Sequence, residues 1–491
     1  MIRSLPCITC ALFIALNCSN KKPLIQKSNV LAVVGDKIIT VQDFIRRAEY
    51  SIRPDYCKQS NYIHKKIVLN SLIAEKLTAL EMERSEDKLL KSQNFQNFLT
   101  GRKEQAMRQL YYNDNFFAKT VVPDSTMKKF LPLSGRTVEV NYINLPDVKT
   151  TIDVQKMLNK NVSISSIYNS LWTGEVPSRK INFFDKEPEV IHDLLFTGEI
   201  NKGDILGPLL NEDGSYLVLK IIGWKDEVSI TGKESKHRWN DISEMMKDKI
   251  AKKKYLTSVQ KLMAGKKIDF NQKVFDQYTY QVSKAYLKND SNQKQAMSKA
   301  LWEEIEAPRK ISLDGNVEID LGAEIFTYQN KQWTVIDLNL LIRSHPLVFR
   351  KRKISTGDFR NQLKLSIADL LRDNMITKKC YEQGLNEDWR VTSNVDMWQD
   401  AYASDRFISI LNNDRERKKN KTPVLYNILI DSLQSKYSKN IKINTGAFEK
   451  IELTSTDMVV NQRGLPYPIV VPMFPILTSD DRLDYGSKLH N

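Results

Sequence analysis

Hydrophobic and polar positions near the start of the chain predict a hairpin followed by helices. Residues 29–40 read as two short strands around a tight Gly-Asp turn, and a helix is expected to begin near Asp43. Apolar residues then recur every three or four positions over 62–84, which predicts a long helix with one buried stripe. Another helix is expected over 94–119.

The same plan returns in the second half of the chain. A hairpin is expected over 324–335, a helix from Asp337, and a long helix over 359–383. Matching residues stand 294 positions apart: Thr40-Val41 and Thr334-Val335, Asp43 and Asp337, Ile73-Ala74-Glu75 and Ile367-Ala368-Asp369. A constant offset across two elements favours internal duplication over two unrelated hairpin–helix starts.

A segment of different character lies between the copies. It predicts a strand over 137–145, short helices over 152–158 and 163–171, a helix near 187–196, and a strand over 215–224. A long amphipathic helix follows, whose buried face is expected to hold Trp239, Ile242, Met246, Ile250, Leu256, Val259 and Met263. Near the C-terminus the pattern predicts a helix over 423–437, a β-like stretch with Ile441 and Ile443, and an extended Pro-rich tail.

These elements predict an α+β, helix-rich, multidomain chain. The expected parts are a signal peptide (1–18), a hairpin with helices (29–131), a small α+β domain (136–227), a helical connection (236–310), a second hairpin–helix module (316–445) and the tail (446–491).

The first residues read as a secretory signal. Arg3 provides the positive start, and an apolar run of about a dozen residues follows, which is too short for a permanent membrane helix. Residues 15–18, Ala-Leu-Asn-Cys, resemble a lipobox, so Cys18 is the expected lipid-bearing residue. The alternative is an ordinary cleaved signal. Since no later segment is apolar for long enough to span a bilayer, membrane attachment is expected to depend on Cys18.

Composition and charge narrow the classes of function. The chain is 41% hydrophobic and 27% charged, as soluble globular proteins are. Its formal charge of +15 is dispersed along predicted helices, so acidic headgroups or acidic unfolded chains are expected partners and nucleic acid is not. The five histidines are scattered, which predicts no metal site and no cofactor, and His192 is expected at the surface. Whether Cys57 and Cys380 form a disulfide is left open by the sequence.

Several of these segments resemble the SurA/PrsA-type foldases, which combine a trigger-factor-like chaperone module with a parvulin domain. The resemblance lies in Val30–Phe44, in the Ile-Ala-Glu-Lys-Leu sequence of 73–77, and in 193–201 with Gly207-Pro208 and 215–221. It implies a chaperone module whose second copy is the internal repeat, and an inserted parvulin-like domain over 136–227.

Departures from the family decide the expected chemistry. A parvulin isomerase carries one histidine on its first strand and one on its last, and these positions map to Tyr142 and Leu217. Arg179-Lys180-Ile181 replaces a Gly-rich turn. The resemblance leaves Phe183, Phe184, Phe196 and Tyr216 as remnants of the pocket. No catalytic residue is therefore assigned, and the domain is expected to be inactive.

The resemblance implies a membrane-tethered, periplasm-facing chaperone of the cell envelope, anchored to the inner or the outer membrane. Its expected partners are unfolded or nascent envelope proteins. Two other functions stay open: an active peptidyl-prolyl cis-trans isomerase, and a structural lipoprotein subunit of an envelope assembly.

Overall fold

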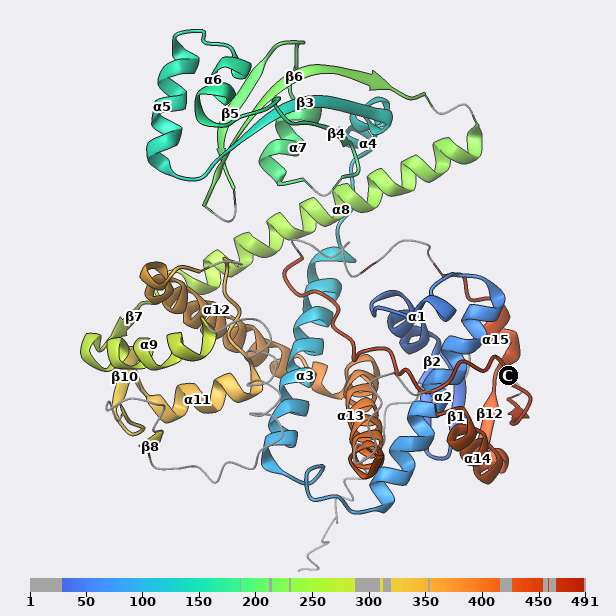
Figure 1. Cartoon of the computed structure of the whole chain (residues 1–491). Coiled ribbons are helices and arrows are strands. Elements are labelled where there is room, and N and C mark those ends of the chain that lie inside the picture. The colour runs from blue at the N-terminus through green and yellow to red at the C-terminus, as the bar shows by residue number, and fades with distance from the viewer. Residues whose placement is uncertain are drawn as a thin grey trace, which may run out of the picture.

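The computed structural model of the chain has an α+β fold, rich in helices and with small sheets (Figure 1). It describes residues 29–185, 187–211, 214–228, 231–287, 310–311, 319–351, 354–415, 426–453, 458 and 465–489. Cys18 and the expected signal peptide lie outside these ranges. No helix in the described ranges is long and apolar enough to cross a membrane.

The first unit, residues 30–112, is a hairpin followed by three helices. Its elements are β1 (Val30–Val34), β2 (Lys37–Thr40), α1 (Val41–Glu49), α2 (Tyr62–Arg84) and α3 (Gln93–Tyr112). Gly35 turns the hairpin with a φ of 65°, a left-handed conformation that glycine adopts without a steric penalty. Thr40 and Asp43 then cap α1 reciprocally: the Asp43 N–H donates to the Thr40 hydroxyl, and the Thr40 N–H donates to the Asp43 carboxylate.

The second unit, residues 324–415, has the same elements in the same order. They are β10 (Glu324–Tyr328), β11 (Lys331–Thr334), α11 (Val335–Ser344), α12 (Thr356–Glu382) and α13 (Trp389–Arg415). Both hairpins, α1 and α11, and the first residues of α2 and α12 correspond at the offset of 294 residues that separates Val30 from Glu324. A bulge after the first strand residue and the Thr-Asp capping box occur in both units. The hairpins and helices expected at both places are confirmed.

Each unit is completed by a third strand from a distant part of the chain. β12 (Ile441–Ile443), which follows the second unit, pairs with β1 of the first unit. β7 (Ile268–Phe270), which follows the inserted domain of the first unit, pairs with β10 of the second. An asparagine directly follows each third strand, and its N–H donates to the hairpin: Asn444 to the Leu31 carbonyl and Asn271 to the Ile325 carbonyl. The third strand of each hairpin therefore follows the other unit in the sequence, and we call this arrangement crossed.

The helices are crossed in the same way. α2 packs against α13 of the second unit, and α12 packs against α3 of the first, while α3 and α13 contact each other between them. Figure 1 shows the first unit with the C-terminal elements α14 (Asn427–Tyr437), β12 and α15 (Thr445–Glu449) on the right. β10, α11 and α12 of the second unit, with β7 and α9 (Gln272–Tyr286), lie on the left, while α13 lies in the centre beside α3. The two units together form one body.

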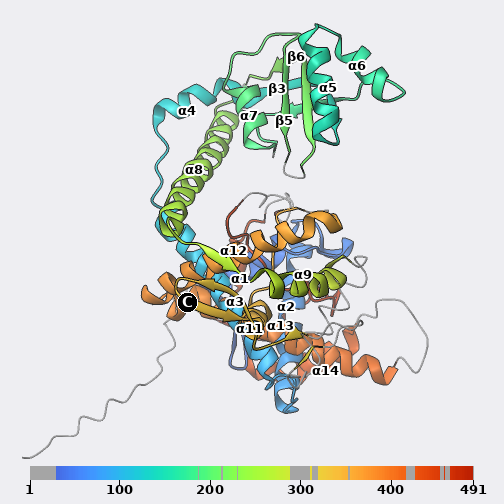
Figure 2. The ribbon, with the colours of Figure 1, turned by 90° about the vertical axis from the view of Figure 1, so that its left-hand side faces the viewer.

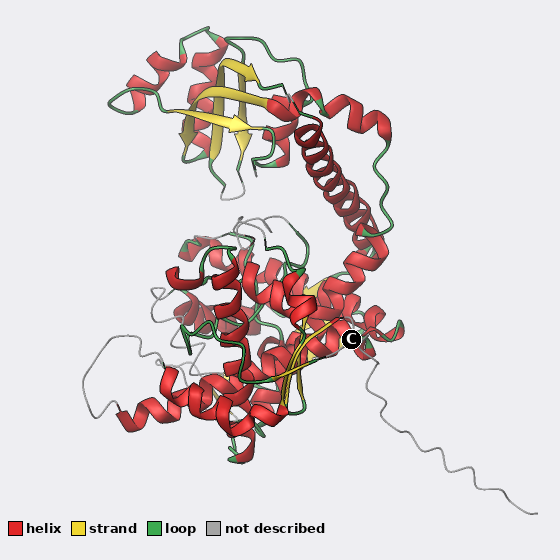
Figure 3. Cartoon of the chain, turned by 90° about the vertical axis from the view of Figure 1, so that its right-hand side faces the viewer, coloured by secondary structure: helices red, strands yellow, loops and turns green. Residues whose placement is uncertain are grey.

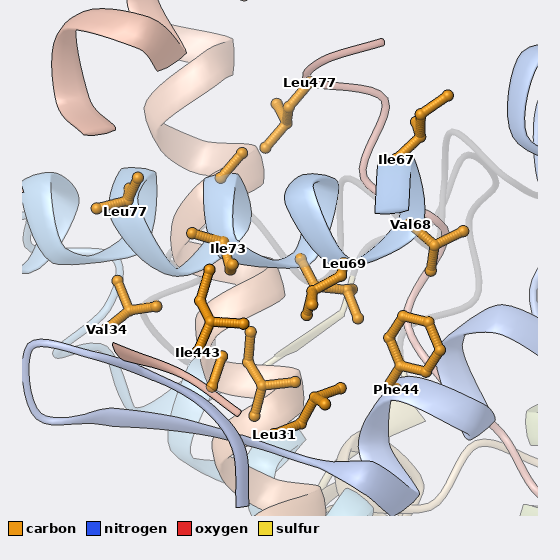
Figure 4. Close-up of a cluster of buried hydrophobic side chains, with 14 of the residues drawn as sticks. Leu31, Val34, Phe44, Ile67, Val68, Leu69, Ile73, Leu77, Ile443 and Leu477 are labelled. Atoms are coloured by element: carbon orange, nitrogen blue, oxygen red, sulfur yellow. The ribbon is translucent and has the colours of Figure 1, made fainter. Parts of the chain in front are cut away.

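The core of the first unit surrounds α2. Apolar side chains of β1, α1 and β12 meet one side of the helix, and Leu477 of the tail meets it as well (Figure 4). Almost every residue from Ile67 to Ala79 is buried. The single buried stripe expected for this helix is therefore wrong, because α13, α14 and the tail cover the sides that a two-layer packing would leave in water.

A four-stranded domain is inserted after α3. Its strands are β3 (Arg136–Leu145), β4 (Ser178–Asn182), β5 (Ile205–Leu210) and β6 (Tyr216–Asp226), in the order β4-β3-β6-β5. Its helices are α4 (Asp124–Phe130), α5 (Val148–Asn159), α6 (Ile164–Leu171) and α7 (Glu189–Phe196). The strands at β3 and β6 and the short helices are confirmed, while β4 and β5 were not expected from the pattern.

The long helix α8 (Gly232–Met263) leads from this domain back to the body, and the domain stands at its far end (Figures 2 and 3). Ile242 and Met246 are buried as expected, against the domain. The prediction that Leu256 is buried is wrong, since its side chain is exposed. Ala251 and Tyr255 are buried instead, because this end of α8 packs on α3 and α12 with a different face.

The tail is extended from residue 465, as expected, but it is not free of the body. Tyr467 is buried between α8, α3 and α12, and Phe474 and Leu477 enter the core of the first unit. Its last strand, β13 (Ser487–Lys488), pairs in parallel with β12. The tail thus follows a path from the centre of the body to the sheet of the first unit.

Candidate functional site

The two motif positions of the inserted domain are brought together by its sheet. Tyr142 on β3 lies opposite Leu219 on β6, and Leu217 lies two residues further along the same face. Leu217 is buried in the core cluster of the domain, and Tyr142 is partly buried against that cluster. The sheet therefore positions these two side chains as neighbours, with a phenol and an isobutyl group in place of two imidazoles.

Polar groups near Tyr142 are already engaged with each other. The Arg179 guanidinium lies 5.6 Å from the centre of the Tyr142 ring. Its two terminal nitrogens donate to the Glu187 carboxylate at 2.9 and 3.1 Å. This ion pair places the guanidinium beside the Tyr142 ring and commits the Glu187 carboxylate to Arg179.

An aromatic cluster fills the space next to these positions. The Phe183 ring centre is 5.3 Å from that of Phe196, and the His192 ring lies 5.1 and 4.9 Å from the two. Phe183 and Phe196 are fully buried, whereas Phe184 is about one third exposed beside Phe183. The cluster is packed protein core, and it contains three of the four residues that the resemblance assigned to the pocket.

Tyr216 lies elsewhere. It packs against the second cluster of the domain, formed by Ile143, Leu145, Val218 and side chains of α5 and α6, on the opposite face of the sheet. The alternation of side chains along β6 explains the separation, because Tyr216 and Leu217 are consecutive and point to opposite faces. Tyr216 is therefore not part of one site with the three phenylalanines.

His192 is buried, so the expectation of a surface position is wrong. Its Nε2–H donates to the Phe183 carbonyl at 3.0 Å. Burial lowers the pKa of His192 below its ordinary value, and the nearby Lys249 ammonium acts in the same direction. The imidazole is thus held neutral, in one tautomer, as a structural hydrogen-bond donor.

The cysteines offer no nucleophile. Cys57 and Cys380 are both free and lie in different core clusters, so no disulfide joins them. Burial raises the pKa of Cys57 to about 11 and that of Cys380 to about 12, which keeps both thiols protonated at neutral pH. Within the described ranges, no group of three or more His, Cys, Asp or Glu side chains could hold a metal ion.

A cavity of about 260 Å³ lies in the body, where the two units and the tail meet. It is bounded by α3, by the segment 344–350 that follows α11, by α12, and by residues 466–468 of the tail. Arg102, Arg108, Arg350 and Arg372 are among the side chains that line it. The sequence did not suggest this site, because its walls come from four separate segments with no local motif.

No protein-family model matches the chain, and no curated protein matches it either.

Proposed function

We propose that the chain is a membrane-tethered envelope chaperone of the SurA/PrsA type, lipidated at Cys18, that holds unfolded secreted or outer-membrane proteins. The sequence resemblance quoted above supports this proposal. The observation that carries it is the placement of the small domain at the end of α8, apart from the body of the two units (Figures 2 and 3). Separate surfaces on one chain suit an unfolded client that makes several weak contacts at once.

Contacts at both ends of the small domain support this view of the arrangement. One end continues into α8, and the β5–β6 hairpin reaches the body near Lys351. A methyl group added at Gly214 in that hairpin would lie 3.6 Å from the Lys351 Nζ atom. The small domain is therefore linked to the body by α8, and its β5–β6 hairpin comes close to the body at Lys351.

Exposed apolar side chains supply the kind of surface that a holding chaperone uses. Apart from Ile428 of α14, the aliphatic residues that are more than half exposed include Ile52, Val121, Val148, Val190, Leu210, Val228, Val348 and Met473. They are distributed over the small domain, the linkers and the body. Single exposed apolar residues are ordinary on soluble proteins, so the proposal needs only that some of them contact a client weakly.

The small domain is proposed to be parvulin-like and without isomerase activity. Rotation of a prolyl amide has a barrier of roughly 18–20 kcal/mol, and its catalysis needs polar groups placed to stabilise the twisted amide. Tyr142 and Leu217 stand at the two motif positions, and Arg179 is occupied by Glu187. A protease-coupled assay on a proline peptide should show no turnover above the uncatalysed rate, and robust turnover would favour the isomerase alternative.

We also infer that the two units arose by internal duplication of one chaperone-like module. The shared bounds, bulge and capping box at a constant offset support this inference.

The holding function is tested by light scattering. A denatured outer-membrane β-barrel protein is diluted into buffer with and without purified residues 19–491. Suppressed aggregation near an equimolar ratio is the expected result. Leu210→Asp, next to the β5–β6 hairpin, should weaken suppression, whereas Ile428→Asp on α14, at the far side of the body, should not (Figure 1). No suppression at any ratio or salt, with one stoichiometric partner in a pull-down, would favour the structural-subunit alternative.

A further inference from the structure

The cavity between the units has a cationic wall. Its lining includes the four arginines named above together with Asp369 and Asp373, so positive side chains outnumber negative ones. The close approach that forms its floor depends on Gly101, because a methyl group there would lie 1.9 Å from the Ser344 carbonyl oxygen. The cavity is therefore built by the crossing of α3 with the end of α11.

Most charges around the cavity are already neutralised. Arg350 donates two hydrogen bonds to Asp369 at 2.9 Å, and Arg372 pairs with Asp369 and Asp373 at 2.8 Å. His345 lies 2.6 Å from the Glu104 carboxylate. These contacts leave little free charge on that side of the cavity.

Arg108 is different. Its side chain is 94% buried, since only 6% of the residue is exposed. It donates one hydrogen bond, of 2.7 Å, to the Thr377 hydroxyl, and its guanidinium lies 5.6 Å from the Tyr467 ring centre. Its Nε atom has no hydrogen-bond partner, and none of the carboxylates in the described ranges forms an ion pair with it.

The Glu104 carboxylate, one turn away on α3, acts on Arg108 electrostatically but forms no ion pair with it. A buried guanidinium without a direct ion pair is costly, and arginine is the side chain that best pairs with carboxylate or phosphate oxygens. Another part of the wall is apolar, with Leu347, Phe349, Leu370 and Pro466, beside the polar residues Gln105, Ser344 and Ser366. A ligand that fits both parts has an anionic group attached to a small apolar body.

We propose that this cavity binds such an organic anion, with its carboxylate or phosphate group on Arg108 and its apolar part against the segment 347–349. This inference does not depend on the proposed chaperone function. Because the walls belong to both units and the tail, an occupant would also tie these three parts together.

Calorimetric titration of the full mature chain with N-acetylphenylalanine, its amide and inorganic phosphate tests the proposal. The free acid should bind at least tenfold more tightly than the amide, and Arg108→Gln should lose at least tenfold in affinity for it. Binding of inorganic phosphate with loss of binding in Arg108→Gln, and no binding of the free acid, would assign the site to phosphate-bearing ligands.

A second pair of variants separates ligand binding from folding. Val348→Glu adds a carboxylate at an exposed valine of the cavity wall, and Val228→Glu adds one at an equally exposed valine beyond β6. The first should weaken binding several-fold, more at low salt, and the second should not. Equal binding of acid and amide, an unchanged affinity in both Arg108→Gln and Val348→Glu, or no binding of any of the three probes would overturn the proposal.

Discussion

The two crossed helix pairs of the body differ in how they are held together. Between α2 and α13, the buried Lys76 ammonium lies 2.5 Å from the buried Asp400 carboxylate, and Lys37 binds the other oxygen at 2.6 Å. α12 and α3 instead meet through apolar side chains, among them Met107 of α3 with Ile376 and Cys380 of α12. The residue of α12 that lies 294 positions after Lys76 is Leu370, which is buried and apolar. The two helix pairs are therefore joined by different kinds of contact.

The charged joint stabilises the crossed packing of α2. Lys76 and Lys37, both of the first unit, find the Asp400 carboxylate on α13 of the second unit. Since a buried ion without its partner costs several kcal/mol, this contact favours keeping α2 against α13.

The largest expected effect is on this charged joint. Asp400→Ala leaves Lys76 buried without a carboxylate and removes one of the two partners of Lys37, so it should lower the free energy of unfolding by about 3–5 kcal/mol. Urea denaturation measures the change.

The double variant Lys76→Leu with Asp400→Ala is its matched control, because it removes both charges of the pair and leaves an apolar contact in their place. It should recover most of the lost stability. A double variant as unstable as Asp400→Ala alone would show that the uncompensated charge on Lys76 is not the cause of the loss.

The two capping boxes should differ by a smaller amount. Thr40→Ala and Thr334→Ala each remove a helix cap, which costs about 1 kcal/mol. Thr40→Ala should cost more, because Asp43 also accepts a hydrogen bond from the Ser393 hydroxyl of α13, and Thr40 is fully buried. Equal losses in urea denaturation would mean that the contact with α13 adds nothing to this cap.

The smallest effect is a dependence of stability on pH. Because burial lowers the pKa of His192 in the folded state, the unfolded chain binds more protons once the pH falls below the ordinary histidine pKa of about 6.5. Stability should therefore fall between pH 7 and pH 5, and it should fall less in His192→Gln. The charged neighbours of His192 are Lys249, Asp193 and Glu189. Thermal unfolding of both proteins at pH 7 and pH 5 measures the loss of stability. Equal losses of stability in the two proteins would contradict the assignment to His192.

The elements that the sequence predicts correctly have local causes. The hairpin turns, Gly35-Asp36 and Gln329-Asn330, the Thr-Asp capping boxes and the helical periodicity act within a few residues. Each copy has its own set of these signals. The pairing of each hairpin with a strand from a distant part of the chain could not be predicted from such local signals. β7 and β12 are three-residue strands, Ile-Asp-Phe and Ile-Lys-Ile, and neither carries a local signal for the hairpin it joins. Their partners are chosen by long-range packing and by the buried charges of α2 and α13.

The candidate sites show the same limit. The resemblance predicted that Tyr142 and Leu217 would be neighbours, but it grouped Tyr216 with them because it ignored the alternation of side chains along a strand. The cavity left one usable signal in the sequence. Arg108 interrupts the apolar residues Met107, Leu110 and Tyr111 of a buried helix, a position where a charge needs a partner.

The crossed arrangement is tested most directly by engineered disulfides in residues 19–491, with Cys57 and Cys380 replaced by serine. Val34→Cys pairs with Ile441→Cys in one variant, because these residues are strand partners in the crossed fold. In the other variant Val34→Cys is combined with Ile268→Cys, the equivalent position of the alternative closing strand. Crossing predicts an intramolecular disulfide in the first variant and free thiols in the second. A disulfide in the second variant and free thiols in the first would contradict it.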